Sequence, residues 1–360
     1  MAEDIYGSLR EKIDQYSVGM VPTETGKEIK ILRRLFTEEE ARVYMGMTRS
    51  LESPKTIAAR VGMEENVIKQ HLETMTEKGL TFPRTTNGVR YYAAAPFMHG
   101  FFEHQLFRKE KDPEIPELFE DYIMTEFIPR TSTMRTVPVM TQVTGDKDTV
   151  LPYDDVRNII QSKERIGLFE CACNYQTHQV GSTCARPSEV CIAFDFYAEY
   201  IIDEMKFGRW ITREEALEVL EKSEKEGLVH QTAGNLVNTE AICNCCPDCC
   251  TVLRRVKMLP QPALFKNTNY RLQHDEQTCT TCLTCIDRCP MTALSLLNEK
   301  IQVNRDRCIG CGLCVSTCPS GSMTLMKKPE AEIKPPPEVY EFMRSTPDLM
   351  RELEEETKRG

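Results

Sequence analysis

Two cysteine-rich stretches decide the fold of this chain: residues 279–290 read CTTCLTCIDRCP, and residues 308–319 read CIGCGLCVSTCP. Both follow the pattern C-x2-C-x2-C-x3-C-P, and each cysteine of the second stretch lies 29 residues after its counterpart in the first. The residues that follow repeat as well, since CPMTALSL at 289–296 aligns with CPSGSMTL at 318–325. A whole unit has therefore been duplicated within this part of the chain.

The duplicated segment resembles the bacterial two-cluster ferredoxins, in which three cysteines of each run bind one 4Fe–4S cluster and the fourth binds the other. This resemblance implies a ferredoxin-like domain over residues 272–327 that holds two 4Fe–4S clusters. It implies that Cys279, Cys282, Cys285 and Cys318 bind one cluster, and that Cys308, Cys311, Cys314 and Cys289 bind the other. A closed zinc site needs only four ligands, so duplication of the whole run favours clusters over zinc.

Nine further cysteines lie at 171–250, in the stretches CACNYQTHQVGSTCARPSEVC and CNCCPDCC. Their spacing fits no short ligand motif, and three interpretations stay open: one or two more 4Fe–4S clusters, a zinc ion, or redox-active thiols. The candidate ligands are Cys171, Cys173, Cys184, Cys191, Cys243, Cys245, Cys246, Cys249 and Cys250. Adjacent cysteines rarely face one metal, so two thiols of CNCCPDCC are either spare or part of a second site. We interpret the nearby His178 and His230 as structural.

The composition fits a globular protein, with 41% hydrophobic and 28% charged residues. The sequence has no apolar run of about 18 residues, and its polar N-terminus lacks the features of a signal peptide. We therefore expect a cytoplasmic protein without a membrane span. Because the cytosol keeps thiols reduced, seventeen cysteines favour metal ligation over disulfides.

The N-terminal part, residues 1–95, is predicted to hold helices followed by a hairpin. Thr37 and Glu40 form a capping box at the start of one helix, and Ser53 precedes the next. Asn87-Gly88 lies between β-prone flanks and predicts a tight hairpin turn. Three helices and a two-stranded wing resemble the winged-helix domains of bacterial regulators, which place the third helix in the DNA major groove.

The charge of the third predicted helix opposes DNA binding. Its sequence, EENVIKQHLETMTEKG at 64–79, has four glutamates against two lysines, and the whole chain has a net charge of −10. Neutralisation of phosphates supplies most non-specific DNA affinity, and an acidic helix repels them. The sequence therefore favours a protein-docking role for this domain, with DNA as the alternative partner.

The remaining segments complete an α+β multidomain prediction. Residues 96–165 are expected to form a helical connection, and residues 166–258 a mostly helical cysteine-rich domain, with a helix capped by Thr212 and Glu215. Residues 328–360 are expected to form a proline spacer at Pro335–Pro337 and a C-terminal helix.

The whole chain resembles winged-helix/ferredoxin fusion proteins of anaerobic prokaryotes. We expect an iron–sulfur electron-transfer protein that passes low-potential electrons to or from an oxidoreductase partner; the alternative is a redox-responsive DNA-binding regulator. The sequence has no dinucleotide-binding glycine pattern, P-loop or nucleophile elbow, and no catalytic residue is identifiable. A subunit of an oxidoreductase complex is therefore favoured over an enzyme acting by itself.

Overall fold

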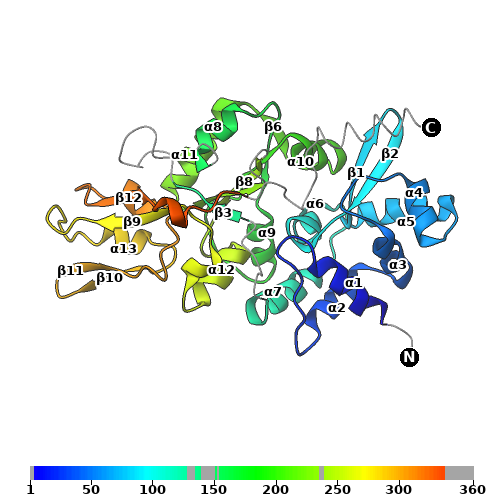
Figure 1. Ribbon diagram of the computed structural model, residues 1–360, viewed down its shortest axis with the longest axis horizontal. Helices are drawn as coiled ribbons and strands as arrows, with labels where there is room; N and C mark the ends of the chain where they lie inside the picture. The colour runs from blue at the N-terminus through cyan, green and yellow to red at the C-terminus, as the bar shows by residue number, and fades with distance from the viewer. Residues whose placement is uncertain (1–3, 128–133, 139–150, 152–153, 235–238, 337–360) are drawn as a thin grey trace.

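The computed structural model describes residues 4–127, 134–138, 151, 154–234 and 239–336. The N-terminal helices and hairpin lie at one end, a six-stranded sheet lies in the middle, and the C-terminal cysteine-rich segment lies at the other end (Figure 1). Helix and sheet are mixed, in agreement with the predicted α+β class. None of the helices in the described ranges combines the length and the apolar character that crossing a bilayer requires.

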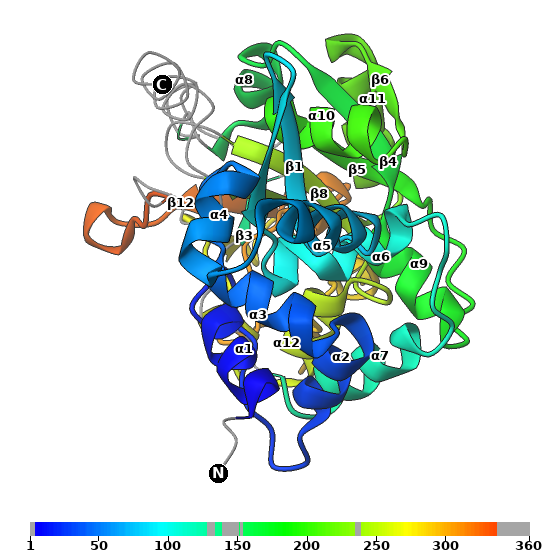
Figure 2. The same ribbon diagram turned by 90° about the vertical axis from the view of Figure 1, so that its right-hand side faces the viewer.

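The N-terminal part has five helices and one hairpin. Their bounds are α1 (Ile5–Asp14), α2 (Lys27–Leu35), α3 (Glu38–Gly46), α4 (Pro54–Val61), α5 (Glu65–Glu77), β1 (Thr81–Thr86) and β2 (Val89–Ala94). The predicted capping box of Thr37 and Glu40 is confirmed, and the side chain of Ser53 accepts the amide of Thr56 at the start of α4. Asn87 and Gly88 both have positive φ, as a tight type I′ turn requires. Figure 2 faces this end of the molecule and shows α4 and α5 beside the hairpin.

The segment after the hairpin contains short helices, as predicted, but also joins the central sheet. Its helices are α6 (Phe102–Phe107), α7 (Ile115–Thr125) and α8 (Val156–Gln161), preceded by a kinked turn at Phe97–Phe101 whose three middle residues are not helical. The short strand β3 (Met134–Thr136) pairs with a strand of the middle domain. Phe97, Phe101 and Phe119 are buried in the N-terminal core, so the first part of this segment packs on α1–α5, whereas β3 and α8 pack with the middle domain.

The prediction of a mostly helical middle domain is wrong, because residues 166–258 supply five strands of an antiparallel sheet. The sheet order is β3-β7-β8-β5-β4-β6. The strands are β4 (Ile166–Glu170), β5 (Glu189–Phe194), β6 (Arg209–Ile211), β7 (Val229–Gly234) and β8 (Thr239–Cys245). The helices are α9 (Ala172–Gln179), α10 (Asp195–Glu199), α11 (Arg213–Lys225) and α12 (Thr251–Met258), with a π-helical turn at Tyr200–Glu204 and a 3-10 turn at Pro262–Phe265.

The inner strands escaped prediction because both of their faces are covered. In β5 every residue from Val190 to Phe194 is buried, so the run shows no alternation of apolar and polar side chains. One face carries Ile166, Leu168, Ile192, Phe194 and Ile242, which pack with residues of α8 and α11. The opposite face carries the cysteines of β5 and β8, so the strand register places thiols of distant segments together.

The C-terminal domain consists of two small sheets around two short helices. Strands β9 (Tyr270–His274) and β12 (Met323–Lys327) pair with each other, and β10 (Leu294–Leu297) pairs with β11 (Lys300–Val303). The helices α13 (Thr284–Arg288) and α14 (Leu313–Ser316) occupy equivalent places in the two repeats. A 3-10 turn follows at Glu330–Glu332, and residues 337–360, where the C-terminal helix is expected, lie outside the described residues.

The hairpin of the N-terminal domain packs on the middle domain through Phe82. This ring is fully buried, and its centroid lies 4.8 Å from that of His104 and 4.8 Å from that of Tyr200. Arg90 of the same hairpin forms an ion pair with Glu204, at 2.9 Å between nitrogen and oxygen. The two domains therefore share an apolar contact with a charged rim.

We expect Phe82→Ala to lower the free energy of unfolding by about 3–5 kcal/mol, because it leaves a cavity between two aromatic neighbours. Val89→Ala, at a side chain 45% exposed on the same hairpin, should change it by less than about 0.5 kcal/mol. Urea unfolding followed by circular dichroism measures both. Equal effects of the two substitutions would contradict this packing.

Candidate metal centres

The eight C-terminal cysteines surround two cavities, four to each. The first cavity, of about 10 Å³, is lined by Cys279, Cys282, Cys285 and Cys318. The second, of about 20 Å³, is lined by Cys289, Cys308, Cys311 and Cys314. Each set takes three thiols from one run and the fourth from the other. These are the two sets that the ferredoxin resemblance implied, although ligation itself stays a prediction.

The loops that carry these thiols repeat in backbone conformation. Thr281 and Leu283 of the first run have φ of 52° and 68°, and Gly310 and Gly312 of the second have 64° and 80°. The left-handed region is unusual for a threonine, yet the first run adopts it at the same two places. The backbone amide of Thr281 lies 3.4 Å from the sulfur of Cys279. The repeat therefore preserves a loop shape that turns backbone donors toward sulfur.

The two cavities differ in their exposure to water. The thiol of Cys282 is exposed, whereas Cys311 and Cys314 are buried. Burial raises the pKa of Cys311 to about 12, because a thiolate loses its hydration there. For Cys318, burial is outweighed by hydroxyl donors from Ser322 and Ser320, and the pKa falls to about 7. The inner thiols therefore need a positive partner to ionise, which a bound metal would supply.

Six of the nine middle cysteines form a closed ring of thiol contacts. Cys171 contacts Cys173 and Cys191, Cys243 contacts Cys191 and Cys245, and Cys250 contacts Cys173 and Cys245. These contacts lower the pKa of Cys171, Cys243 and Cys250, which accept the hydrogen bonds, and raise that of the three donors. We call this group the six-thiol ring.

The sheet and two helices bring the six-thiol ring together. Cys243 and Cys245 are two residues apart in β8 and share one face of the sheet. Ile192 of β5 pairs with Ile242, which makes Cys191 the cross-strand neighbour of Cys243. Cys171 and Cys250 are the N-cap residues of α9 and α12. Both thiols thus lie at helix N-termini, where unpaired amides and the helix dipole stabilise negative charge.

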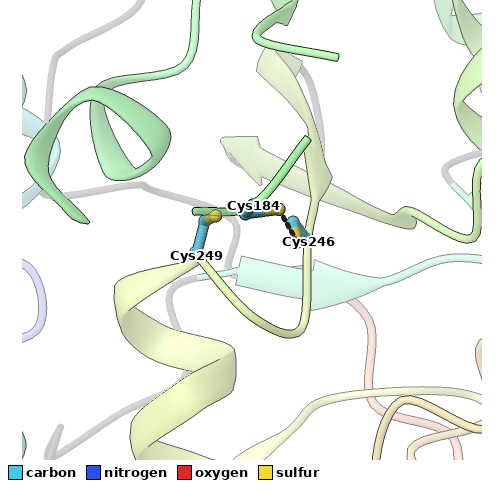
Figure 3. Close-up of side chains that lie close together, drawn as sticks. All are labelled: Cys184, Cys246 and Cys249. Atoms are coloured by element: carbon cyan, nitrogen blue, oxygen red, sulfur yellow. Dashed lines mark hydrogen bonds between the residues drawn. The ribbon is translucent and has the colours of Figure 1, made fainter. Parts of the chain in front are cut away.

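The other three middle cysteines form a separate compact group, which we call the three-thiol group. The sulfur atoms of Cys184, Cys246 and Cys249 all lie within 4.8 Å of one another, and those of Cys184 and Cys246 are 3.6 Å apart (Figure 3). A hydrogen bond from Cys246 is the main cause that lowers the pKa of Cys249 to about 5. The adjacent pairs of CNCCPDCC are therefore divided, since Cys245 and Cys250 belong to the ring.

A cavity of about 60 Å³ borders five thiols of the ring. Most of its lining is apolar or aromatic, but His99, Glu103 and Lys266 also face it. Burial favours neutral His99, yet a hydrogen bond to Cys243 outweighs it and raises the pKa to about 9. Burial lowers the pKa of Lys266, and the negative charges of Cys250, Cys245 and Cys243 offset part of this shift. Two bases, the half-buried His99 and the buried Lys266, therefore lie beside a group of thiols.

The two histidines of the middle domain, His178 and His230, do not line the cavity beside the ring. The ring nitrogens of His178 lie 2.8 Å and 3.0 Å from the carbonyl oxygens of Asn174 and Cys184. His230 is buried against the side chain of Asn244, and burial lowers its pKa to about 4. Both fit the structural role predicted for them. Sequence reasoning missed Lys266, because nothing in its neighbourhood marks it.

Comparison with known families identifies the C-terminal domain. A family model described as a 4Fe-4S dicluster domain matches residues 271–319, the span that contains all eight C-terminal cysteines. No curated protein matches the chain. The C-terminal part is therefore a ferredoxin-like iron–sulfur domain, and the match leaves the nine middle cysteines outside it.

We expect Gly310→Ala to reduce the iron retained per chain, because a Cβ there would lie 2.5 Å from the carbonyl oxygen of Tyr270. Gly321→Ala is the matched control: its φ of +67° imposes the same backbone strain, but nothing lies within 4 Å of the added carbon. Iron analysis of both purified variants tests this. Equal retention by the two variants would show that the close approach of Gly310 is not needed.

Proposed function

We propose that this chain is an iron–sulfur electron-transfer protein that passes low-potential electrons to or from an oxidoreductase partner in the cytoplasm. The observation that carries the proposal is the pair of four-cysteine cavities in the C-terminal domain. Each cavity combines both runs, which is how a two-cluster domain shares its ligands. When bound, 4Fe–4S clusters supply storage and transfer of single electrons.

The donor set fits such clusters. Cysteine thiolates are the usual ligands of 4Fe–4S clusters, and each cavity offers four of them. Cys279, Cys282, Cys285 and Cys318 would hold one cluster, and Cys308, Cys311, Cys314 and Cys289 the other. Since cysteine would fill every ligand position, the C-terminal domain has no ligand position left for a substrate. The role that remains for it is to relay electrons.

A partner would approach the first cavity, which is lined by the exposed Cys282. Cys282 is exposed, and the adjacent Leu283 is 38% exposed. Leu296 and Leu297 of β10 are exposed as well. An apolar side chain beside an exposed cluster ligand, on a domain with further exposed leucines, suits a transient protein contact, and electron-transfer complexes use small interfaces. We therefore assign docking of the redox partner to this end of the C-terminal domain.

The two hairpin arginines, Arg84 and Arg90, oppose the alternative function of DNA binding by the N-terminal domain, because both are paired with carboxylates. Arg90 pairs with Glu204 and Glu73, and Arg84 lies 3.6 Å from Glu199. Cations that neutralise carboxylates of the same chain are not available to phosphates. We propose instead that the three helices and hairpin are a protein module that packs on the middle domain.

We expect reductive titration of anaerobically purified protein to show that Cys282→Ser lowers the reversible electron uptake by about one electron per chain, the capacity of one 4Fe–4S cluster. The matched control Leu264→Ser, at a side chain 75% exposed and outside both cysteine sets, should keep the wild-type uptake. Unchanged uptake in Cys282→Ser, or turnover of a substrate by the C-terminal domain alone, would contradict the proposal.

A second prediction concerns nucleic acid. We expect the protein, in oxidised or reduced form, to give no gel shift with DNA from upstream of its own gene at about 0.1 M salt, where surface charges are screened beyond about 10 Å. Binding that survives competitor DNA and is lost in Arg84→Ala and Arg90→Ala would favour the regulator instead.

A further inference from the structure

We propose that the nine middle cysteines form two different metal centres: the six-thiol ring binds an iron–sulfur cluster, and the three-thiol group binds a single zinc ion. The six-thiol ring and the three-thiol group share no cysteine, although their cysteines are interspersed along the sequence. The metal assignment rests on space, charge and sulfur spacing within each group.

The cavity beside the ring is larger than a single ion needs. A cavity of about 10–15 Å³ holds one water molecule, so the 60 Å³ beside the ring accommodates a group of several atoms. The two cavities of the C-terminal domain, with four cysteines each, have about 20 Å³ and 10 Å³. By this comparison within one molecule, the ring has room for a 4Fe–4S cluster or a larger one.

The polar groups around the ring also favour a negatively charged, thiolate-ligated cluster. The N-termini of α9 and α12 begin at Cys171 and Cys250, and the backbone amides of Asn174 and Leu253 donate to these two sulfurs. The Lys266 side chain is buried in the wall of the cavity and donates to the side-chain oxygen of Gln231. Amide and amine donors are thus turned toward the ring, and buried donors of this kind need acceptors or negative charge. A thiolate-ligated cluster in the ring would supply that charge.

Sulfur spacing suits a single ion in the three-thiol group. Zinc–sulfur bonds of about 2.3 Å at tetrahedral angles place sulfurs about 3.8 Å apart. The distance between Cys184 and Cys246 is 3.6 Å, and all three sulfurs lie within 4.8 Å. The carboxylate of Asp248 lies 3.9 Å from the sulfur of Cys246 but pairs with Arg186 and is not within 4.8 Å of all three sulfurs. Three thiolates therefore leave the fourth tetrahedral position to a water molecule.

The location of the ring extends the proposed electron path. Cys245 and Cys250 belong to the same apolar core as Cys311, Ile309 and Leu313 of the C-terminal domain. Cys285 and Cys314 in turn share a core that joins the two C-terminal cavities. If the proposed electron-transfer function holds, the exposed Cys282 marks the outer end of this series and the ring marks the inner end.

The adjacent pair Cys245 and Cys246 provides the test. Iron, acid-labile sulfide and zinc are measured per chain for anaerobically purified full-length wild type, Cys245→Ser and Cys246→Ser. We expect Cys245→Ser to lose at least about four iron with matching sulfide and to keep its zinc, because one 4Fe–4S cluster is lost. We expect Cys246→Ser to lose about one zinc and to keep its iron.

Three outcomes would overturn the assignment. Loss of equal iron from both variants would place the two thiols in one centre. Zinc instead of iron lost from Cys245→Ser would make the ring a zinc site. Unchanged metal in Cys245→Ser, with ring disulfides found by mass spectrometry, would make the ring a redox-active thiol set.

A second pair of variants controls for misfolding. Cys250→Ser and Cys249→Ser should repeat the results of Cys245→Ser and Cys246→Ser, respectively, with unchanged far-ultraviolet circular dichroism. The electron paramagnetic resonance signal of the reduced C-terminal clusters should persist in all four variants. If Cys282→Ser keeps its full iron while Cys245→Ser loses iron, the proposed function fails and the ring assignment stands. If Cys282→Ser loses iron while Cys245→Ser keeps its full iron, the proposed function stands and the ring assignment is rejected.

Discussion

A buried thiolate needs a positive partner, and much of this chain is arranged around that requirement. Burial raises the pKa of Cys311 and Cys314 far above the usual range for a thiol, so the protein interior alone leaves them protonated. Elsewhere the chain provides partial compensation. Two helices begin at Cys171 and Cys250, and Lys266 is buried beside the ring. These devices favour negative charge at the places where thiols of distant segments converge.

The fold links these centres through packing. The central sheet places helices on one face and thiols on the other, and its cysteine face shares an apolar core with the C-terminal domain. The N-terminal domain covers the cavity beside the ring, since Val18, His99 and Phe102 line it. The N-terminal domain therefore closes the space around the ring, while its hairpin arginines are paired with carboxylates of the same chain.

The sequence predicted most about the parts in which spacing carries the information. The resemblance of the 29-residue repeat to two-cluster ferredoxins implied which cysteines share each C-terminal cavity. The capping residues Thr37 and Ser53 located helix starts. The middle domain resisted prediction because β5 is buried on both faces and shows no alternation. The division of Cys245 from Cys246 depends on where β8 ends, and the place of Lys266 depends on tertiary contacts, which no local pattern records.

The central claim is that one chain holds iron in the C-terminal domain and in the six-thiol ring, with a different metal at Cys184, Cys246 and Cys249. Anomalous diffraction from crystals grown without oxygen, recorded on both sides of the iron and zinc absorption edges, tests this most directly. The account predicts iron density in both C-terminal cavities and in the ring, and zinc density between the three sulfurs. Iron confined to the C-terminal domain, with an empty ring, would contradict it.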